Sequence, residues 1–372
     1  MTKNRWAWAE IDLSAITSNV ANLKALTPAS TQFMAVVKAD GYGHGSVHSA
    51  RAALAGGADW LGVATVGEGL ELRKAGISER IMLLSEPPQE SIPRLLRHSL
   101  TATVTTRDFA VALGKQATAE GSVAPYHLKV DTGMNRIGIR AEDAAQFALG
   151  LSDFPGLRLE GTFTHFATAD VPGDWEVERQ IERFRSALQE FRTEGVDPGV
   201  VHAANSPATI LYPETHLDMV RCGLSIYGLY PSPAAQKRVK LTPARTVKAR
   251  TTLVKRVGVG ESVSYGFTWT AAAPTVVATL PLGYADGIHR VASNEISVLV
   301  DGKRCRQIGR VCMDQFMVEV PRGVSAAYGD EVVIVGSQGR EHIALEELAE
   351  ASGTINYEIS CSLGMRLERV YR

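Results

Sequence analysis

The sequence has little cysteine, no surplus of charge of one sign and no apolar run long enough to cross a membrane. Its four cysteines lie far apart, which argues against a CxxC zinc site and against a disulfide framework. Lysine and arginine total 39 and aspartate and glutamate 40, so no basic patch indicates nucleic acid or an anionic membrane. No apolar leader follows the first residues. We therefore expect a cytoplasmic protein that holds no metal and meets its ligands through isolated charged residues.

The 372 residues are too many for one ordinary domain, and their 45% hydrophobic content is enough for two cores. Between about residues 33 and 230, short apolar runs alternate with helical patterns. The runs are Phe33–Val37, Trp60–Ala64, Ile81–Leu84, Leu100–Val104, Tyr126–Val130, Leu159–Phe163, Val200–Ala203 and Met219–Cys222. Because they lack polar alternation, they predict strands buried on both faces, as in a parallel sheet. Eight such units predict a (β/α)8 TIM barrel, with an open doubly wound sheet as the alternative.

Two of the helical patterns between these runs are clear. One places its apolar residues on a single face at Ile16, Val20, Leu23 and Leu26, with Ser14 as a candidate N-cap. The other runs from Val177 to Phe191 and stops before Gly195. Both stretches predict amphipathic helices.

After about residue 241 the alternation of apolar runs and helical patterns gives way to short β-rich stretches. They lie at Thr246–Val259, Thr275–Leu280, Ile296–Val300, Met317–Val320 and Val332–Val335. Few helical patterns intervene before Leu345–Ala351. We therefore predict a barrel domain over residues 1–240 and a mainly β-strand domain over residues 241–372, against which residues 1–10 pack.

Lys38 ends the first predicted strand and is followed by a loop that contains Gly41, Gly43 and Gly45. A lone lysine at a strand end more often keeps its ammonium in water than reacts. Here the strand is apolar up to Lys38, and the glycines let the backbone approach a ligand closely. A lysine in an apolar pocket has a lowered pKa and can form a Schiff base. Both interpretations stay open on these residues alone.

Polar side chains also gather where the later predicted strands end. They are Lys129, Asp131 and Arg136 at the fifth, His165 at the sixth, Asn205 and Ser206 at the seventh, and Arg221 at the eighth. Barrel enzymes carry their active sites at the carboxyl ends of the strands and often bind phosphate after strands seven and eight, which favours the barrel over the open sheet. Ser206 offers a hydroxyl there, and Gly223 and Leu224 offer backbone N–H groups. A lysine across the barrel from a phosphate site predicts pyridoxal 5'-phosphate as cofactor.

Several segments resemble the signatures of alanine racemases, in the family's order and over nearly the whole chain. They are residues 37–45 (VKADGYGHG), 129–138 (KVDTGMNRIG), 164–170 (THFATAD), 221–227 (RCGLSIY), 263–266 (VSYG), 283–287 (GYADG), 309–315 (GRVCMDQ) and 356–359 (NYEI). The resemblance implies a (β/α)8 barrel followed by a β domain, in agreement with the pattern of predicted strands. Cys222 stands where the family usually has proline, a change that removes no catalytic atom.

The resemblance also implies how the cofactor is held. Lys38 would carry it and act as one of two bases, with Tyr265 as the other. The remaining cofactor-binding residues, most of them at its phosphate, would be Tyr42, Asn205, Ser206, Gly223, Leu224 and Tyr357. Tyr265 and Met313 would reach the site from the partner subunit of a homodimer. By the same resemblance, Lys129 would be carbamylated by CO₂, as in some relatives, which gives an anion that holds Arg136.

By the same resemblance, further residues would surround the substrate and the cofactor ring. Arg136 would orient both the cofactor and the substrate carboxylate, while Met313 and Asp314 would border the substrate. His165 would lie beside the ring and beside Arg221, whose guanidinium would face the pyridine nitrogen. The substrate implied is a small amino acid.

Arg221 argues for racemisation in particular. An arginine keeps its proton, so the pyridine nitrogen that faces it has to accept a hydrogen bond and stay unprotonated. Decarboxylases and transaminases usually place a carboxylate there, which makes the ring a stronger electron sink. Racemisation needs only one proton moved between the faces of the α-carbon, with a base on each face, here Lys38 and Tyr265. A tyrosine with a pKa of about 10 is a poor base, so His165 polarised by Arg221 is one route to favour its phenolate.

Each of these residues also has an ordinary structural interpretation. His165 is compatible with a buried core histidine, Tyr265 with an aromatic residue at a strand start, and Asp314 with a turn cap. The family resemblance favours interconversion of L-alanine and D-alanine, which supplies D-alanine for cell-wall peptidoglycan. The alternatives are a serine or broader-specificity racemase, a decarboxylase on the same scaffold, and a non-catalytic pyridoxal-phosphate-binding protein. The last class resembles the barrel alone, whereas this chain retains Tyr265 and Met313.

Overall fold

The protein divides into two compact units in a computed structural model that describes residues 5–364 and 366–372. One unit comprises residues 14–41 and 46–242 and is named the barrel unit. The other comprises the described residues up to Leu13, residues 42–45 and the described residues from Pro243 onward, and is named the strand unit. No helix in the described part of the chain is both long and apolar enough to pass through a bilayer.

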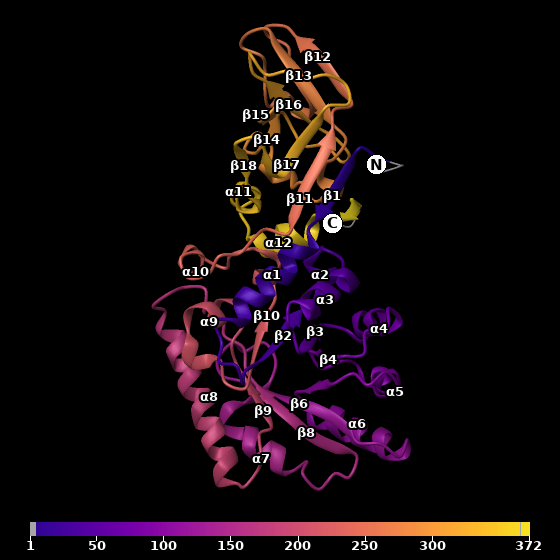
Figure 1. The fold of residues 1–372 in the computed structure, drawn as a ribbon, viewed down its shortest axis with the longest axis vertical. Helices are drawn as coiled ribbons and strands as arrows, with labels where there is room; N and C mark the ends of the chain where they lie inside the picture. Colours follow the sequence, from indigo (N-terminus) through magenta and orange to yellow (C-terminus); the bar gives the residue numbers. More distant parts are fainter. Residues whose placement is uncertain (1–4, 365) are drawn as a thin grey trace. The chain divides into compact units, whose positions relative to one another are not determined.

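Eight parallel strands form the barrel unit and pair in the order β4-β3-β2-β10-β9-β8-β6-β5 (Figure 1). They are β2 (Gln32–Val36), β3 (Trp60–Val63), β4 (Arg80–Leu83), β5 (Ala102–Val104), β6 (Ala124–Asp131), β8 (Leu157–Phe163), β9 (Val200–His202) and β10 (Met219–Cys222); a short β7 (Ile139–Arg140) pairs with β6. Hydrogen bonds from Thr101 N to Ile81 O (2.9 Å) and from Leu83 N to Thr101 O (3.0 Å) join β4 to the chain entering β5 and close the ring. The predicted (β/α)8 barrel is therefore confirmed, and the open doubly wound sheet is wrong.

Apolar side chains fill part of the interior of the ring. Five strands contribute one buried cluster, made of Met34, Trp60, Met82, Phe163 and Met219. Because an eight-stranded barrel is only wide enough to be filled by side chains, its interior is a packed core and not a pore. Polar side chains that share this interior therefore have to find hydrogen-bond partners inside it.

Helices follow the strands and lie around them (Figure 1). They are α1 (Leu13–Lys24), α2 (Lys38–Tyr42), α3 (Ser46–Ala55), α4 (Val66–Lys74), α5 (Ile92–Arg97), α6 (Arg107–Ala119), α7 (Ala144–Leu149), α8 (Trp175–Thr193), α9 (Ser206–Leu211) and α10 (Pro233–Gln236). Helix α8 ends two residues before Gly195, as predicted, and buries Val177 and Phe191. The predicted N-cap at Ser14 is wrong: α1 begins at Leu13, directly after the preceding strand, so Ser14 lies inside its first turn.

The strand unit contains one sheet in the order β12-β13-β16-β15-β14-β17-β11-β1-β19, with β18 paired to β17. Its strands are β1 (Ala7–Ile11), β11 (Arg245–Arg250), β12 (Leu253–Val257), β13 (Thr275–Leu280), β14 (Ser297–Val300), β15 (Lys303–Ile308), β16 (Phe316–Val320), β17 (Glu331–Gln338), β18 (Glu341–Ile343) and β19 (Glu368–Tyr371). The mainly β-strand prediction is confirmed, although residues 246–259 form two strands and not one continuous stretch. Strand β15 had no prediction because its sequence, KRCRQI, is largely polar. Two helices, α11 (Leu345–Ala351) and α12 (Asn356–Ser362), complete the unit.

Candidate active site

Lys38 follows β2 and opens a turn with an unusual backbone. The three residues after it, Ala39, Asp40 and Gly41, have φ values of 52°, 53° and 61° and ψ values of 50°, 47° and 43°. This is one turn of left-handed helix, a conformation that costs an L-residue other than glycine roughly 1–3 kcal/mol. Such backbone persists only where its surroundings hold it, and it is concentrated at functional sites.

Two carboxylates hold this turn in place. One oxygen of Glu68, in α4, accepts a hydrogen bond from Ala39 N (2.8 Å), and the other accepts from Ala64 N (2.7 Å) and Thr65 N (3.1 Å). Asp40 Oδ1 accepts from Ser46 N (3.0 Å). The position of the half-buried Lys38 is therefore set by hydrogen bonds to the turn that follows it. Glu68 was not predicted as a site residue, although the Thr65-to-Glu68 spacing of a capping box marks it.

Arg221, in β10, is 3% exposed and donates to four acceptors inside the barrel. Its NH1 donates to His202 Nδ1 (3.0 Å), and its NH2 donates to the carbonyl oxygens of Thr164 (2.7 Å) and Ala203 (3.0 Å). NH2 also lies 3.3 Å from His165 Nδ1. Burial lowers the pKa of Arg221 to about 9, so the guanidinium stays charged at neutral pH.

The two imidazoles beside Arg221 are neutral. Burial lowers the pKa of His165 and that of His202 well below the ordinary value, and the charge of Arg221 adds to the effect. A neutral imidazole has one donor and one acceptor nitrogen. Because arginine can only donate, Nδ1 is the acceptor nitrogen in both rings.

Lys129, in β6, is the second lysine of the site and is 3% exposed. Its Nζ donates to Val130 O (2.9 Å) and lies 5.4 Å from the centre of the Phe163 ring. Burial, with a further contribution from the charge of Arg221, lowers the pKa of Lys129 to about 7. A large share of these amines is thus unprotonated and nucleophilic at neutral pH.

The loop after β6 presents Arg136 to solvent. Asp131 shapes the loop, because its Oδ1 accepts from Gly133 N (2.9 Å) and Asn135 N (3.1 Å). Gln180 of α8 braces it further by donating to Thr132 Oγ1 (3.2 Å). Within the described part of the chain, the exposed Arg136 makes no hydrogen bond or ion pair, so its guanidinium is available to an anionic ligand.

The segments that follow β9 and β10 meet in a small polar cradle. Ser206, the first residue of α9, accepts a hydrogen bond at Oγ from Gly223 N (2.9 Å). Asn205 caps α9 by accepting from Ala208 N (3.1 Å). The next turn, η4 (Leu224–Tyr227), starts at the cradle, and the first N–H groups of a helical turn have no partner within it. Ser225 Oγ is buried there and has no hydrogen-bond partner among the described residues.

The other predicted site residues belong to the strand unit. The rings of Tyr42 and Tyr357 lie 6.4 Å apart. Tyr265 is 73% exposed and follows Ser264, which has a left-handed φ of 69° and whose Oγ donates to Arg310 O (2.7 Å). Met313 is 53% exposed, and Asp314 accepts from Arg366 NH2 (2.8 Å).

The predicted residues of the barrel unit thus fall at the carboxyl ends of five strands: β2, β6, β8, β9 and β10. Their roles remain predictions. No prediction was made for His202, His127 or Glu160, although each is a polar residue inside a mainly apolar strand, which is a signal that could have marked it. In the described residues, no group of three or more His, Cys, Asp or Glu side chains is arranged to hold a metal ion.

Comparisons with known proteins cover nearly the whole chain. The family described as alanine racemase, N-terminal domain, matches residues 11–231, and the alanine racemase C-terminal domain matches residues 244–371. The alanine racemase of Symbiobacterium thermophilum is 46% identical over 99% of this chain and 97% of its own length. The crystal structure of alanine racemase from Bacillus anthracis with bound L-Ala-P has a TM-score of 0.94 and 38% identity, over 100% of this chain and 96% of that one. The crystal structure of alanine racemase from Streptomyces lavendulae has a TM-score of 0.93 and 42% sequence identity, over 100% of this chain and 98% of that one.

Proposed function

Because this chain belongs to the alanine racemase family, we propose that it is an isomerase that interconverts L-alanine and D-alanine with pyridoxal 5'-phosphate as cofactor. The observation that carries this proposal is the buried guanidinium of Arg221, held as a permanent donor between two neutral imidazoles. The product D-alanine would serve cell-wall peptidoglycan, and the protein would act in the cytoplasm.

The residues present fit this cofactor. A phosphate needs several N–H and O–H donors, and the cradle offers the Ser206 hydroxyl, the buried and unpartnered Ser225 hydroxyl, and the N–H groups that open η4 at Leu224. We assign Asn205 and Gly223 to the same cradle, with Tyr42 and Tyr357 as further phosphate ligands. When bound, pyridoxal phosphate draws electrons from the substrate's α-carbon, which lets its proton leave.

Arg221 sets the strength of that electron withdrawal. Its N–H groups can donate to the pyridine nitrogen, but they cannot protonate it. The cofactor is therefore a weaker electron sink than one paired with a carboxylate. This arrangement favours return of the proton to the α-carbon over transamination. His165 lies beside Arg221, and Arg136 would bind the substrate carboxylate.

Lys38 and Tyr265 are the proposed bases on opposite faces of the α-carbon. In one direction the Lys38 amine accepts the α-proton and the Tyr265 phenol donates a proton to the opposite face; in the other direction the roles reverse. Tyr265 and Met313 are largely exposed in their own chain, which supports their reaching the site of a partner subunit in a homodimer. Asp314 would border the substrate beside Met313.

Lys129 is proposed to be carbamylated. Its unprotonated Nζ would attack the carbon of CO₂, form an N–C bond and release a proton, and the product is an anion that can hold Arg136. The burial and lowered pKa of Lys129 support this step, because only the neutral amine reacts. Intact mass measured under native conditions tests it: added mass of one CO₂, absent from Lys129→Met, is expected, and an unmodified amine at every bicarbonate concentration would overturn it.

The decisive test of the function is polarimetry of L-alanine and of D-alanine with the purified protein, with and without added pyridoxal phosphate. We expect both to reach the same racemic end point, and only with cofactor bound. A colourless protein after reconstitution, or release of CO₂ faster than loss of optical rotation, would overturn the proposal. L-serine in the same assay measures how far the specificity extends beyond alanine.

A further inference from the structure

A line of buried polar side chains crosses the barrel from the amino ends of the strands to Arg221. It contains Glu160 in β8, His127 in β6 and His202 in β9, and each lies on a different strand from the next. Both histidines are fully buried, and Glu160 is 8% exposed. An apolar barrel core holds such groups only where they satisfy one another.

The distances along this line define a direction for every proton. Arg221 NH1 donates to His202 Nδ1, so the proton of His202 is on Nε2. That Nε2 lies 2.7 Å from His127 Nδ1, which therefore accepts, so the proton of His127 is also on Nε2. His127 Nε2 lies 3.8 Å from Glu160 Oε2 and has no hydrogen-bond partner closer to it among the described residues. A separation of 3.8 Å is longer than a hydrogen bond, so the Glu160 carboxylate attracts this N–H through its negative charge at the end of the line.

The two rings have little freedom to adopt another arrangement. The His202 ring stacks on Phe163 with 4.8 Å between centroids and 7° between planes. The His127 ring meets Trp60 edge-on at 5.5 Å. Burial lowers the pKa of His127 and that of His202, so each ring carries one proton and acts as donor at one nitrogen only.

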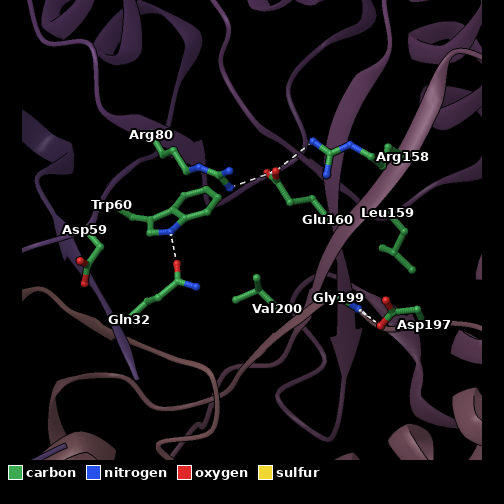
Figure 2. A pocket seen from close by; sticks show the side chains of 10 residues that line it. All are labelled: Gln32, Asp59, Trp60, Arg80, Arg158, Leu159, Glu160, Asp197, Gly199 and Val200. Atoms are coloured by element: carbon green, nitrogen blue, oxygen red, sulfur yellow. Dashed lines mark hydrogen bonds and ion pairs between the residues drawn. The ribbon is translucent and has the colours of Figure 1, made fainter. Parts of the chain in front are cut away.

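Glu160 is held as a carboxylate at the amino end of the barrel. Its Oε1 accepts from Arg80 NH1 (3.0 Å) and from Arg158 NH2 (3.1 Å), which approach it from two sides in Figure 2. Burial alone would raise the pKa of Glu160, but His127 and Arg80 outweigh it and bring the pKa to about 2. Glu160, Arg80 and Arg158 line a cavity of about 840 Å³, which keeps the two arginines in contact with solvent (Figure 2).

We propose that Glu160 is a positioning residue for Arg221: its negative charge at the end of the line favours the Nε2–H tautomers of His127 and His202, which keeps an acceptor nitrogen facing the guanidinium. With the tautomers reversed, His202 would present an N–H to the N–H of Arg221, and the guanidinium would be displaced. The value of this arrangement for catalysis rests on the function proposed above. The tautomers themselves do not depend on it.

The variant Glu160→Gln keeps the shape of the side chain and replaces the charged carboxylate with a neutral amide. Glutamine has one side-chain oxygen, and the two arginine donors compete for it. The two N–H groups of the amide then face His127 Nε2 and the Thr101 hydroxyl, which donates to Glu160 Oε2 in the wild type (3.4 Å), and they require an acceptor in each. We therefore expect His127 and His202 to move their protons from Nε2 to Nδ1. Asp197→Asn is the matched control, because this exposed carboxylate lines the same cavity but accepts from Gly199 N (2.9 Å) and not from the line of histidines.

Nuclear magnetic resonance of isotope-labelled imidazole nitrogens in the cofactor-free protein reads the tautomers directly, with His127→Asn and His202→Asn for assignment. The expected result is Nε2–H in both rings of the wild type and of Asp197→Asn, Nδ1–H in Glu160→Gln, and return to Nε2–H in Glu160→Asp, which restores the carboxylate. An Nδ1–H form of either ring in the wild type would overturn the proposal even if Glu160→Gln failed to fold. Unchanged tautomers in Glu160→Gln would also overturn it.

The second measurement uses the enzyme with pyridoxal phosphate bound and compares the rates of racemisation and transamination. The ratio of racemisation to transamination is expected to fall roughly 10-fold in Glu160→Gln, a size typical of residues that orient a ligand through another side chain, and to stay unchanged in Asp197→Asn. Altered tautomers with an unaltered ratio would refute the link from Glu160 to Arg221 and catalysis. Absence of racemase activity in the wild type would refute the proposed function and leave the tautomer result standing.

Discussion

The two proposed bases sit in very different surroundings. Lys38 lies in the barrel unit at the start of a left-handed turn, and two carboxylates hold the next two residues, Ala39 and Asp40, by hydrogen bonds to backbone N–H groups. Tyr265 lies in the strand unit and is 73% exposed. A base that its own unit holds in place can act only there, whereas an exposed side chain on a defined turn is free to complete a site elsewhere. One chain can therefore contribute to a site in two ways: through a residue that is held in place within its own unit, and through an exposed residue that can complete a site elsewhere.

The largest effect is expected at the internally held base. Lys38→Ala removes both the attachment of the cofactor and one of the proton acceptors. Racemisation should fall by at least about 10⁴-fold, and the absorbance of bound cofactor should disappear. Lys115→Ala, at an exposed lysine of α6, is the control and should leave both unchanged. Retention of cofactor absorbance in Lys38→Ala would show that another residue carries the cofactor.

Tyr265→Ala should have a smaller and one-sided effect. Because the two enantiomers have equal free energies, both overall rate constants fall together, so the asymmetry has to be measured as exchange of the α-proton with deuterated solvent. We expect this exchange to fall about 10²–10⁴-fold for the enantiomer that Tyr265 deprotonates and to persist for the other. Equal small losses for both enantiomers would contradict the two-base assignment.

A mixture of Lys38→Ala and Tyr265→Ala subunits tests whether the two bases of one site come from different subunits. If Tyr265 completes the partner's site, a dimer of one Lys38→Ala subunit and one Tyr265→Ala subunit has one site with both bases intact. Co-refolding should then restore up to about half of the sites in each mixed dimer. Mixtures that stay inactive, while wild-type subunits recover activity under the same conditions, would place both bases in one chain.

Lys129 makes the stability of the barrel unit depend on pH. Its pKa is about 7 when folded against an unfolded value of 10.5, so between these values the unfolded state binds more protons and the free energy of unfolding rises with pH. The wild type should therefore gain up to about 4 kcal/mol over Lys129→Met from pH 7 to pH 10.5, less any share lost to carbamylation. Chemical denaturation of both proteins across this range measures the difference. A difference that is constant or that falls with pH would contradict the buried amine.

The smallest expected effects are on the free energy of unfolding, and they differ between the surroundings of Lys38 and those of Tyr265. Glu68→Ala removes the acceptor of three exposed or half-buried N–H groups around the left-handed turn and should lower the free energy of unfolding by about 0.5–1.5 kcal/mol. Tyr265→Ala, at an exposed side chain, should change it by less than about 0.5 kcal/mol when measured on dissociated subunits. Urea unfolding tests both. A larger loss for Tyr265→Ala than for Glu68→Ala would reverse the contrast.

The eight barrel strands were predictable because each is a short run of mainly apolar residues without regular polar alternation, and Lys38, His165 and Arg221 were predictable as polar residues where such runs end. Glu160, His127 and His202 were not singled out, although they are polar residues inside the same runs. Each is one residue on a different strand, so no local pattern links them. Gln180 was missed for the same reason, since it acts on a loop far away in the chain. The capping-box spacing marks Glu68 as a helix cap, but its hydrogen bond to Ala39 exists only in the folded chain.

What the sequence by itself determined is the alternation of buried strands and amphipathic helices, the change to a β-rich second part, and the motifs that identify the family. These are local properties, because burial on both faces, helical periodicity and residue type can all be read along the chain. The tertiary structure decided the closure of the barrel, the left-handed turn after Lys38 and the line of protons from Arg221 to Glu160. Those depend on which strands become neighbours, and hydrogen bonds across a barrel exist only once the ring has closed.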